Sequence, residues 1–185
     1  MTTVTIMNLA TRCTFYINME TRIDRRLSME RNFGASITRV VALNVSSARL
    51  LAGRFNLKMT PSRSKGSKSA VRLPELACTL SHKRVFRAAL EQNCSLAIVL
   101  EDDVRPQGCN SLARMREVLL AAPRGTRVVQ FLTNHPFMRS VCGANNATIQ
   151  RPLNAWGTAA YAITRTGMQF LVNKPIVQRY AVADY

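Results

Sequence analysis

The sequence is poor in acidic and aromatic side chains and has no long apolar run. Asp and Glu number only 10 in 185 residues, against 26 Lys and Arg, so the formal net charge is +16. Aromatic residues make up 6% and form no RNP motif, and neither a helix-turn-helix nor a zinc-finger pattern is present. The charge supports a basic nucleic-acid-binding protein but does not distinguish it from a protein that binds anionic lipid or phosphorylated glycolipid. Without those motifs, nucleic-acid binding is the last-ranked hypothesis.

The sequence also lacks the usual signals of membrane-spanning and secreted proteins. No apolar stretch approaches the roughly 20 residues that span a bilayer. The first residues have no basic segment ahead of an apolar one, so we expect no secretory signal. The sequence favours a cytoplasmic protein, and its basic surface would suit peripheral attachment to the inner face of an anionic membrane.

The cysteines show no spacing that indicates a shared role. They are odd in number, widely scattered and without a C-x-x-C pair: Cys13, Cys78, Cys94, Cys109 and Cys142. This pattern fits neither a disulfide framework nor a zinc site. We therefore expect reduced thiols that behave as small buried hydrophobes.

Length and periodicity predict a single α/β domain over residues 1–185. Strands are expected at 13–17, 37–43, 95–100, 127–132 and 159–163, and helices at about 23–33, 74–92, 110–122 and 166–173. Thr21 and Asp24 are spaced as a capping box at the start of the first helix, and Gly34 is placed to end it. The alternation predicts a mostly parallel sheet flanked by helices.

Between Glu30 and Glu75 the chain has basic residues but no acidic one. Within that stretch, residues 59–69 (MTPSRSKGSKS) lack apolar periodicity and predict a mobile basic loop.

An acidic triplet follows the most strand-like segment of the chain. Residues 95–100 (SLAIVL) form an unbroken apolar run, typical of a strand covered on both faces, and Glu101-Asp102-Asp103 follows directly. Ligands of open α/β sheets bind beyond the carboxyl ends of the strands, and hard divalent cations bind carboxylates. If the extended backbone continues, Glu101 and Asp103 point to one side and Asp102 to the other. The alternative is an ordinary acidic turn.

Four segments in order resemble glycosyltransferase family 25, which includes enzymes of lipooligosaccharide synthesis and collagen galactosyltransferases. Leu80–His82 on a helix is followed by the apolar strand and acidic motif of Ser95–Val104. Tyr16–Arg25 resembles the family's first strand with Ile-Asn-Leu and its Asp-Arg-Arg-Pro-Asp-Arg, with departures at Met19, Glu20, Thr21 and Ile23. Gly157–Thr164 resembles the family's Gly-Thr segment, its Tyr and the strand that follows.

The resemblance implies a GT-A-like (Rossmann-like) fold and transfer of a sugar such as galactose from a UDP-sugar to a glycan or glycolipid. Family members are usually inverting, and a divalent metal, Mn²⁺ or Mg²⁺, is implied at Asp103 and Asp102. Donor contacts are implied at the matching positions Asn18, Arg22, Arg25, Ser81, His82, Glu101, Gly157 and Thr158.

The general base is expected at Asp184 or Asp102. Asp184 is the only acid after Glu117, and related enzymes carry an acidic residue in this region. Several of these positions also have purely structural explanations. Helical spacing predicts a packed core histidine at His82. Arg22 and Arg25 would suit a solvated helix surface, and Asp184 would suit a frayed chain end. A catalytically inactive, glycosyltransferase-like binding protein is the main alternative function.

Overall fold

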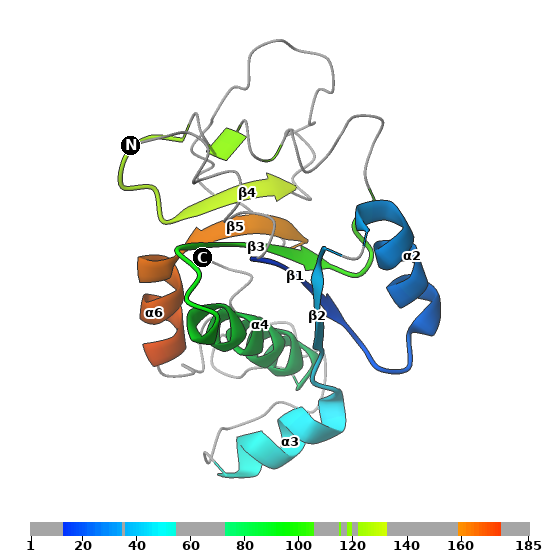
Figure 1. Cartoon of the computed structure of the whole chain (residues 1–185). Helices are drawn as coiled ribbons and strands as arrows, with labels where there is room; N and C mark the ends of the chain where they lie inside the picture. Colours follow the sequence, from blue (N-terminus) through cyan, green and yellow to red (C-terminus); the bar gives the residue numbers. More distant parts are fainter. Residues whose placement is uncertain are drawn as a thin grey trace, which may run out of the picture.

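The fold is a five-stranded sheet with helices on both faces (Figure 1). The computed structural model describes residues 13–34, 36–54, 73–105, 115, 118–119, 122–132 and 159–174. The chain order of its elements is β1 (Thr14–Asn18), α2 (Ile23–Phe33), β2 (Thr38–Val41), α3 (Val45–Arg54), α4 (Leu73–Glu91), β3 (Leu96–Glu101), β4 (Val128–Leu132), β5 (Ala160–Thr164) and α6 (Arg165–Asn173).

The strand order in the sheet is β2-β1-β3-β5-β4. β1 pairs in parallel with both β2 and β3, whereas β5 is antiparallel to both β3 and β4. The expectation of a mostly parallel sheet is therefore wrong for two of the four pairings. Apolar patterning does not carry strand direction, because a strand buried on both faces is apolar whichever way it runs.

Alternate residues of the strands feed two separate cores. Phe15, Val99 and Ile163 point to one face, where they pack with residues of α4 and α6. Tyr16 and Leu100 point to the other face and pack with Met29 and Phe33 of α2. This period of two explains why β3 is apolar from Leu96 to Leu100, since both of its faces are buried there.

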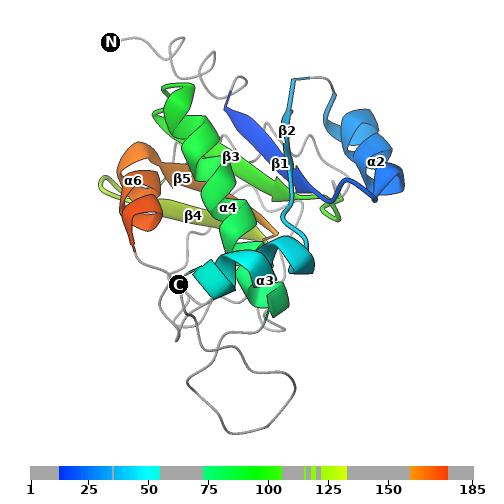
Figure 2. The ribbon, with the colours of Figure 1, turned by 90° about the horizontal axis from the view of Figure 1, so that it is seen from below.

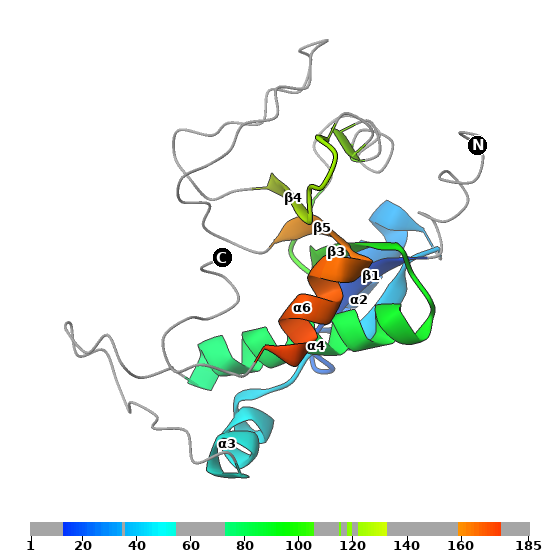
Figure 3. The same cartoon turned by 90° about the vertical axis from the view of Figure 1, so that its left-hand side faces the viewer.

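On the first face, α4 and α6 lie against the strands, and α3 crosses the end of α4 (Figures 2 and 3). The α3 contact is a small cluster in which Ala48 and Ala52 meet Leu76 and Ala77. Lys83 of α4 is largely buried, and its ammonium donates to the carbonyl oxygen of Lys174 at the end of α6, at 2.6 Å. A cation at the negative end of the helix dipole joins the two helices.

The ends of α2 follow one sequence signal and contradict another. α2 has the predicted bounds, and Gly34 follows it with φ 75°, a conformation that glycine adopts without strain. The predicted capping box is wrong, because Arg22 occupies the N-cap and makes no side-chain capping bond. The first turn is instead bound to the end of β1, since Asn18 donates to the carbonyl oxygen of Arg22 at 3.1 Å.

Helix α3 was not expected from the sequence. Its signal is Asn44, whose side-chain oxygen accepts a hydrogen bond from the backbone N–H of Ser47 at 2.8 Å. That contact is an N-terminal cap of the usual kind. The expected helix at 110–122 lies largely outside the described residues, of which 115 and 118–119 are helical, and the expected loop at 59–69 lies wholly outside them. Within the described ranges, no helix is both long and apolar enough to cross a membrane.

Cys13 and Cys94 form a disulfide, so the expectation of reduced thiols is wrong for this pair. The two residues precede β1 and β3 and lie 81 positions apart in the sequence. Scattered spacing carries no signal for this bond, because parallel pairing of the two strands brings the cysteines together. Cys78 is exposed and lies outside the disulfide, contrary to the expected burial.

Removal of the disulfide should lower stability. Closing a loop of this length restricts the unfolded chain, so the double variant Cys13→Ser/Cys94→Ser should lose roughly 2–4 kcal/mol of unfolding free energy in urea titrations. Alkylation of the denatured, unreduced protein, read by peptide mass spectrometry, should label Cys78 but neither Cys13 nor Cys94. Labelling of Cys13 would contradict the bond.

Gly167 of α6 should not tolerate a side chain. A Cβ there would lie 2.9 Å from Cγ1 of Ile163 and 3.1 Å from the carbonyl oxygen of Arg127. Gly167→Ala should therefore destabilise the protein by roughly 1–3 kcal/mol, despite the better helix propensity of alanine. Gly53→Ala in α3 is the matched control, because its Cβ meets nothing within 4 Å, and it should stabilise by up to about 1 kcal/mol. Equal thermal shifts would refute the packing argument.

Candidate functional site

Asn18 lies at the centre of a polar network where the parallel strands β1 and β3 end. It is 1% exposed and uses both ends of its carboxamide. Nδ2 donates to Oδ2 of Asp102 at 2.8 Å, in addition to the carbonyl oxygen of Arg22, and Oδ1 accepts from Nε of Arg39 at 2.9 Å. A buried polar atom without a hydrogen-bond partner is costly, so the carboxamide of Asn18 keeps all of these bonds. Its bond to Oδ2 therefore fixes the position of Asp102.

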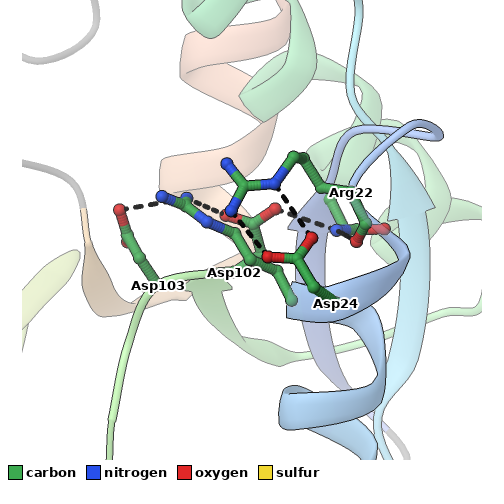
Figure 4. A network of polar contacts seen from close by, with 6 residues as sticks. Arg22, Asp24, Asp102 and Asp103 are labelled. Atoms are coloured by element: carbon green, nitrogen blue, oxygen red, sulfur yellow. Dashed lines mark hydrogen bonds and ion pairs between the residues drawn. The ribbon is translucent and has the colours of Figure 1, made fainter.

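Asp102 and Asp103 share one guanidinium group. Nη1 of Arg25 lies 2.7 Å from Oδ1 of Asp102 and 3.3 Å from Oδ2 of Asp103. Figure 4 shows Asp102 between Asp103 on one side and Arg22 with Asp24 on the other. Asp103 is 54% exposed in its side chain, whereas Asp102 is mostly buried. Two carboxylates therefore converge on one cation at the edge of the sheet.

The acidic triplet does not continue the strand. β3 ends at Glu101, and the backbone N–H of Val104 donates to the carbonyl oxygen of Glu101, which closes a turn. The condition for the alternation is therefore not met, and the alternative, an acidic turn, is what the structure shows. Asp102 and Asp103 face the same arginine, and Glu101 faces His82, with 3.5 Å between Oε1 and Nε2. Aspartate is frequent in turns, and the two adjacent aspartates therefore favour a turn over continuation of the strand.

The two arginines predicted to contact the donor both lie at this edge. Arg22 forms a bidentate pair with Asp24, at 2.9 and 2.7 Å. Its guanidinium lowers the pKa of Asp24 to about 2. A surface pocket of about 290 Å³ is lined by Arg22, Asp24, Arg25, Ser28, Asp102, Asp103, Val104 and Arg105. Its lining of guanidinium and carboxylate groups suits a charged, oxygen-rich ligand.

His82 is buried, as helical spacing indicated, and is 1% exposed. Its Nδ1 lies 2.8 Å from the hydroxyl oxygen of Tyr161 on β5. Burial, with smaller contributions from Glu101 and Cys78, holds the pKa of Tyr161 well above its ordinary value, so the phenol stays neutral. Tyr161 belongs to the Gly157–Thr164 segment, but its contact with His82 could not be read from the sequence.

Ser81 is also buried, and its hydroxyl joins two elements. Oγ donates to the carbonyl oxygen of Ala77 at 2.7 Å and accepts from the backbone N–H of Leu43 at 2.8 Å. These bonds attach the segment after β2 to α4. Donor contact by Ser81 stays a prediction, as it does for His82.

Other predicted positions cannot be placed. Asp184, Gly157 and Thr158 lie outside the described residues. Arg39, by contrast, belongs to the network and was missed by sequence reasoning. Its only signal is a charged residue within the otherwise uncharged strand β2.

Comparison with known proteins gives the family of the chain. The family model of glycosyltransferase family 25, described as an LPS biosynthesis protein, matches residues 12–113, more than half of the chain. This range contains the Asn18, Arg25 and Asp102–Asp103 network and the Ser81-His82 pair. No curated protein matches the chain at a significant level. The chain belongs to glycosyltransferase family 25.

Proposed function

We propose that the protein transfers a sugar, galactose or a similar hexose, from a nucleotide-sugar donor to a glycan or glycolipid acceptor. Family membership supports a glycosyltransferase. The observation that carries the donor assignment is the convergence of Asp102 and Asp103 on Arg25, beside buried Asn18, at the carboxyl ends of two parallel strands. This end of an α/β sheet is where ligands bind.

The carboxylates fit a divalent cation. Asp102 and Asp103 offer hard oxygen ligands and already direct oxygens toward one positive group, the guanidinium of Arg25. When bound there, Mn²⁺ or Mg²⁺ would offset negative charge on the departing diphosphate. Arg25 and Arg22 are placed at the same pocket, and a guanidinium group binds phosphate oxygens through paired N–H donors.

Asn18 and Asp102 have a positioning role in this scheme. Both oxygens of Asp102 accept hydrogen bonds, from Asn18 and from Arg25, which suits a carboxylate that holds a ligand more than one that removes a proton. In an inverting transfer the acceptor oxygen bonds to the anomeric carbon as the bond to the diphosphate breaks, and a general base takes the hydroxyl proton. Asp184 remains the proposed base, from the family resemblance alone.

The acceptor is proposed to lie at an anionic membrane surface. The net charge of +16 supports peripheral association, since basic surfaces are attracted to anionic headgroups. The family's description as an LPS biosynthesis protein supports an acceptor that is held in a membrane. The GT-A-like classification is part of the same proposal.

A donor screen tests the function directly. The protein is incubated with UDP-sugars with and without Mn²⁺, and released UDP is measured. Release that requires the cation supports the proposal. Donor binding without release would favour the inactive binding protein, and binding of nucleic acid in preference to any donor would favour the remaining alternative.

Asp103→Asn should abolish most turnover and leave the fold intact. Removal of one ligand charge should lower kcat by about 10²-fold or more, because charge on the leaving group loses its compensation. The side chain is exposed and its ion pair is long, so the unfolding free energy should change by less than about 0.5 kcal/mol.

The matched control is Glu30→Gln, which removes a half-exposed carboxylate that pairs with Arg26 on α2 and accepts from the hydroxyl of Tyr16, outside the pocket. It should keep wild-type turnover. Full activity of Asp103→Asn, or of the wild type in excess chelator, would reject the cation site.

Asn18→Asp should damage the network from within. The replacement keeps the shape but puts a carboxylate in place of the amide that donates to Asp102 at 2.8 Å. Loss of that bond and the new repulsion should cost about 1–3 kcal/mol of unfolding free energy at neutral pH. Asn32→Asp, the same change at an exposed position in the last turn of α2, loses a 3.3 Å bond to Ser28 and meets the helix dipole, and should cost less than about 1 kcal/mol. Similar urea midpoints for the two variants would contradict the role of Asn18.

A further inference from the structure

A second group of ligand-type side chains lies on the other side of the turn after β3. Cys78 and His82 are four residues apart on α4 and therefore project from one face of the helix. Glu101 ends β3 beside them. The cysteine sulfur, a histidine ring nitrogen and a carboxylate oxygen all lie within 4.8 Å of one another. Neither Asp102 nor Asp103 belongs to this group.

His82 supplies an independent sign that the group binds something. Its side chain is 1% exposed, and Nε2 is buried with no hydrogen-bond partner. An unsatisfied buried polar atom is costly and rare in native proteins, and it calls for an explanation. Nε2 points toward the carboxylate of Glu101, whose Oε1 is 3.5 Å away.

The other ring nitrogen has the partner that a metal-binding histidine needs. Nδ1 lies 2.8 Å from the hydroxyl of Tyr161. If Nδ1–H donates to that oxygen, Nε2 keeps its lone pair free for an ion, and the ring orientation is fixed. An outer partner of this kind is usual for histidine ligands.

The donor set selects the class of ion. Thiolate, imidazole and carboxylate are the ligands of Zn²⁺, whereas Mg²⁺ and Ca²⁺ take oxygen alone. Tetrahedral Zn²⁺ with bonds near 2.0–2.1 Å separates nitrogen and oxygen ligands by about 3.3 Å. The observed 3.5 Å between Nε2 and Oε1 is close to this spacing. Cys78 is exposed and the Glu101 side chain is 31% exposed, so an ion can enter from solvent and keep a water as fourth ligand.

We propose that Cys78, His82 and Glu101 form a binding site for Zn²⁺ or a similar transition-metal ion. The ion would attach α4 to the end of β3, one residue before Asp102. The site is separate from the hard-cation site proposed at Asp102 and Asp103, and it does not depend on sugar transfer. In the competing arrangement Tyr161 donates to Nδ1, and Nε2–H faces Glu101 without an ion.

Cobalt provides the test, because a thiolate bound to Co²⁺ gives a charge-transfer band in the near ultraviolet. Co²⁺ is added to the full chain with its disulfide intact, and Zn²⁺ is then titrated in competition. The wild type should show the band at one equivalent and lose it to Zn²⁺. Cys78→Ser should show no band, while Cys109→Ser and Cys142→Ser, the matched cysteine controls, should retain it.

Two further variants separate an ion site from a merely structural network. Glu101→Gln should weaken Zn²⁺ binding by at least about 10-fold, and Tyr161→Phe by about 10–100-fold, the usual effect of removing an outer partner. Asp103→Asn should leave the thiolate band unchanged even where turnover is lost, so the two proposals can fail independently. The absence of a band in the wild type, or its survival in Cys78→Ser, would overturn the site.

Discussion

One hydrogen bond, from the carboxamide of Asn18 at the end of β1 to Asp102 just after β3, orients the side chains of the proposed donor site. Parallel pairing of β1 with β3 brings both strand ends to the same edge, but pairing alone does not orient the side chains. The amide fixes Asp102, Asp102 positions Arg25, and Arg25 brings in Asp103. Arg39 on β2 completes the chain of contacts from the opposite side. The amide of Asn18 and the guanidinium of Arg25 offset the repulsion between the carboxylates of Asp102 and Asp103, so these charged groups can lie close together.

Local patterns predicted the elements well because they act over a few residues. The apolar run before Glu101 predicted β3, Gly34 predicted the end of α2, and helical spacing predicted burial of His82. The position of the acidic triplet after a central strand was likewise readable, and with it the edge of the sheet where a ligand would bind.

Features that depend on distant parts of the chain could not be predicted in this way. The Cys13–Cys94 bond joins residues that only strand pairing brings together, and the direction of β5 leaves no trace in its composition. The sequence left two conformations open for the triplet, because a turn and a continued strand compete over three residues, and the turn decides which carboxylates are neighbours. The Cys78–His82–Glu101 group could not be predicted either, because only the packing of α4 against β3 brings Glu101 to the two residues of α4.

The position of β5 between β3 and β4 has a consequence for how the chain matures. β4 reaches the sheet only through β5, which lies some 28 residues later in the sequence. During synthesis β3 can pair with β1, yet its other edge stays open, apolar and able to accept a foreign strand until residues 160–164 emerge. The sheet can therefore be completed only when its last strand is available, and until then the free edge of β3 is a place where a strand of another chain could pair.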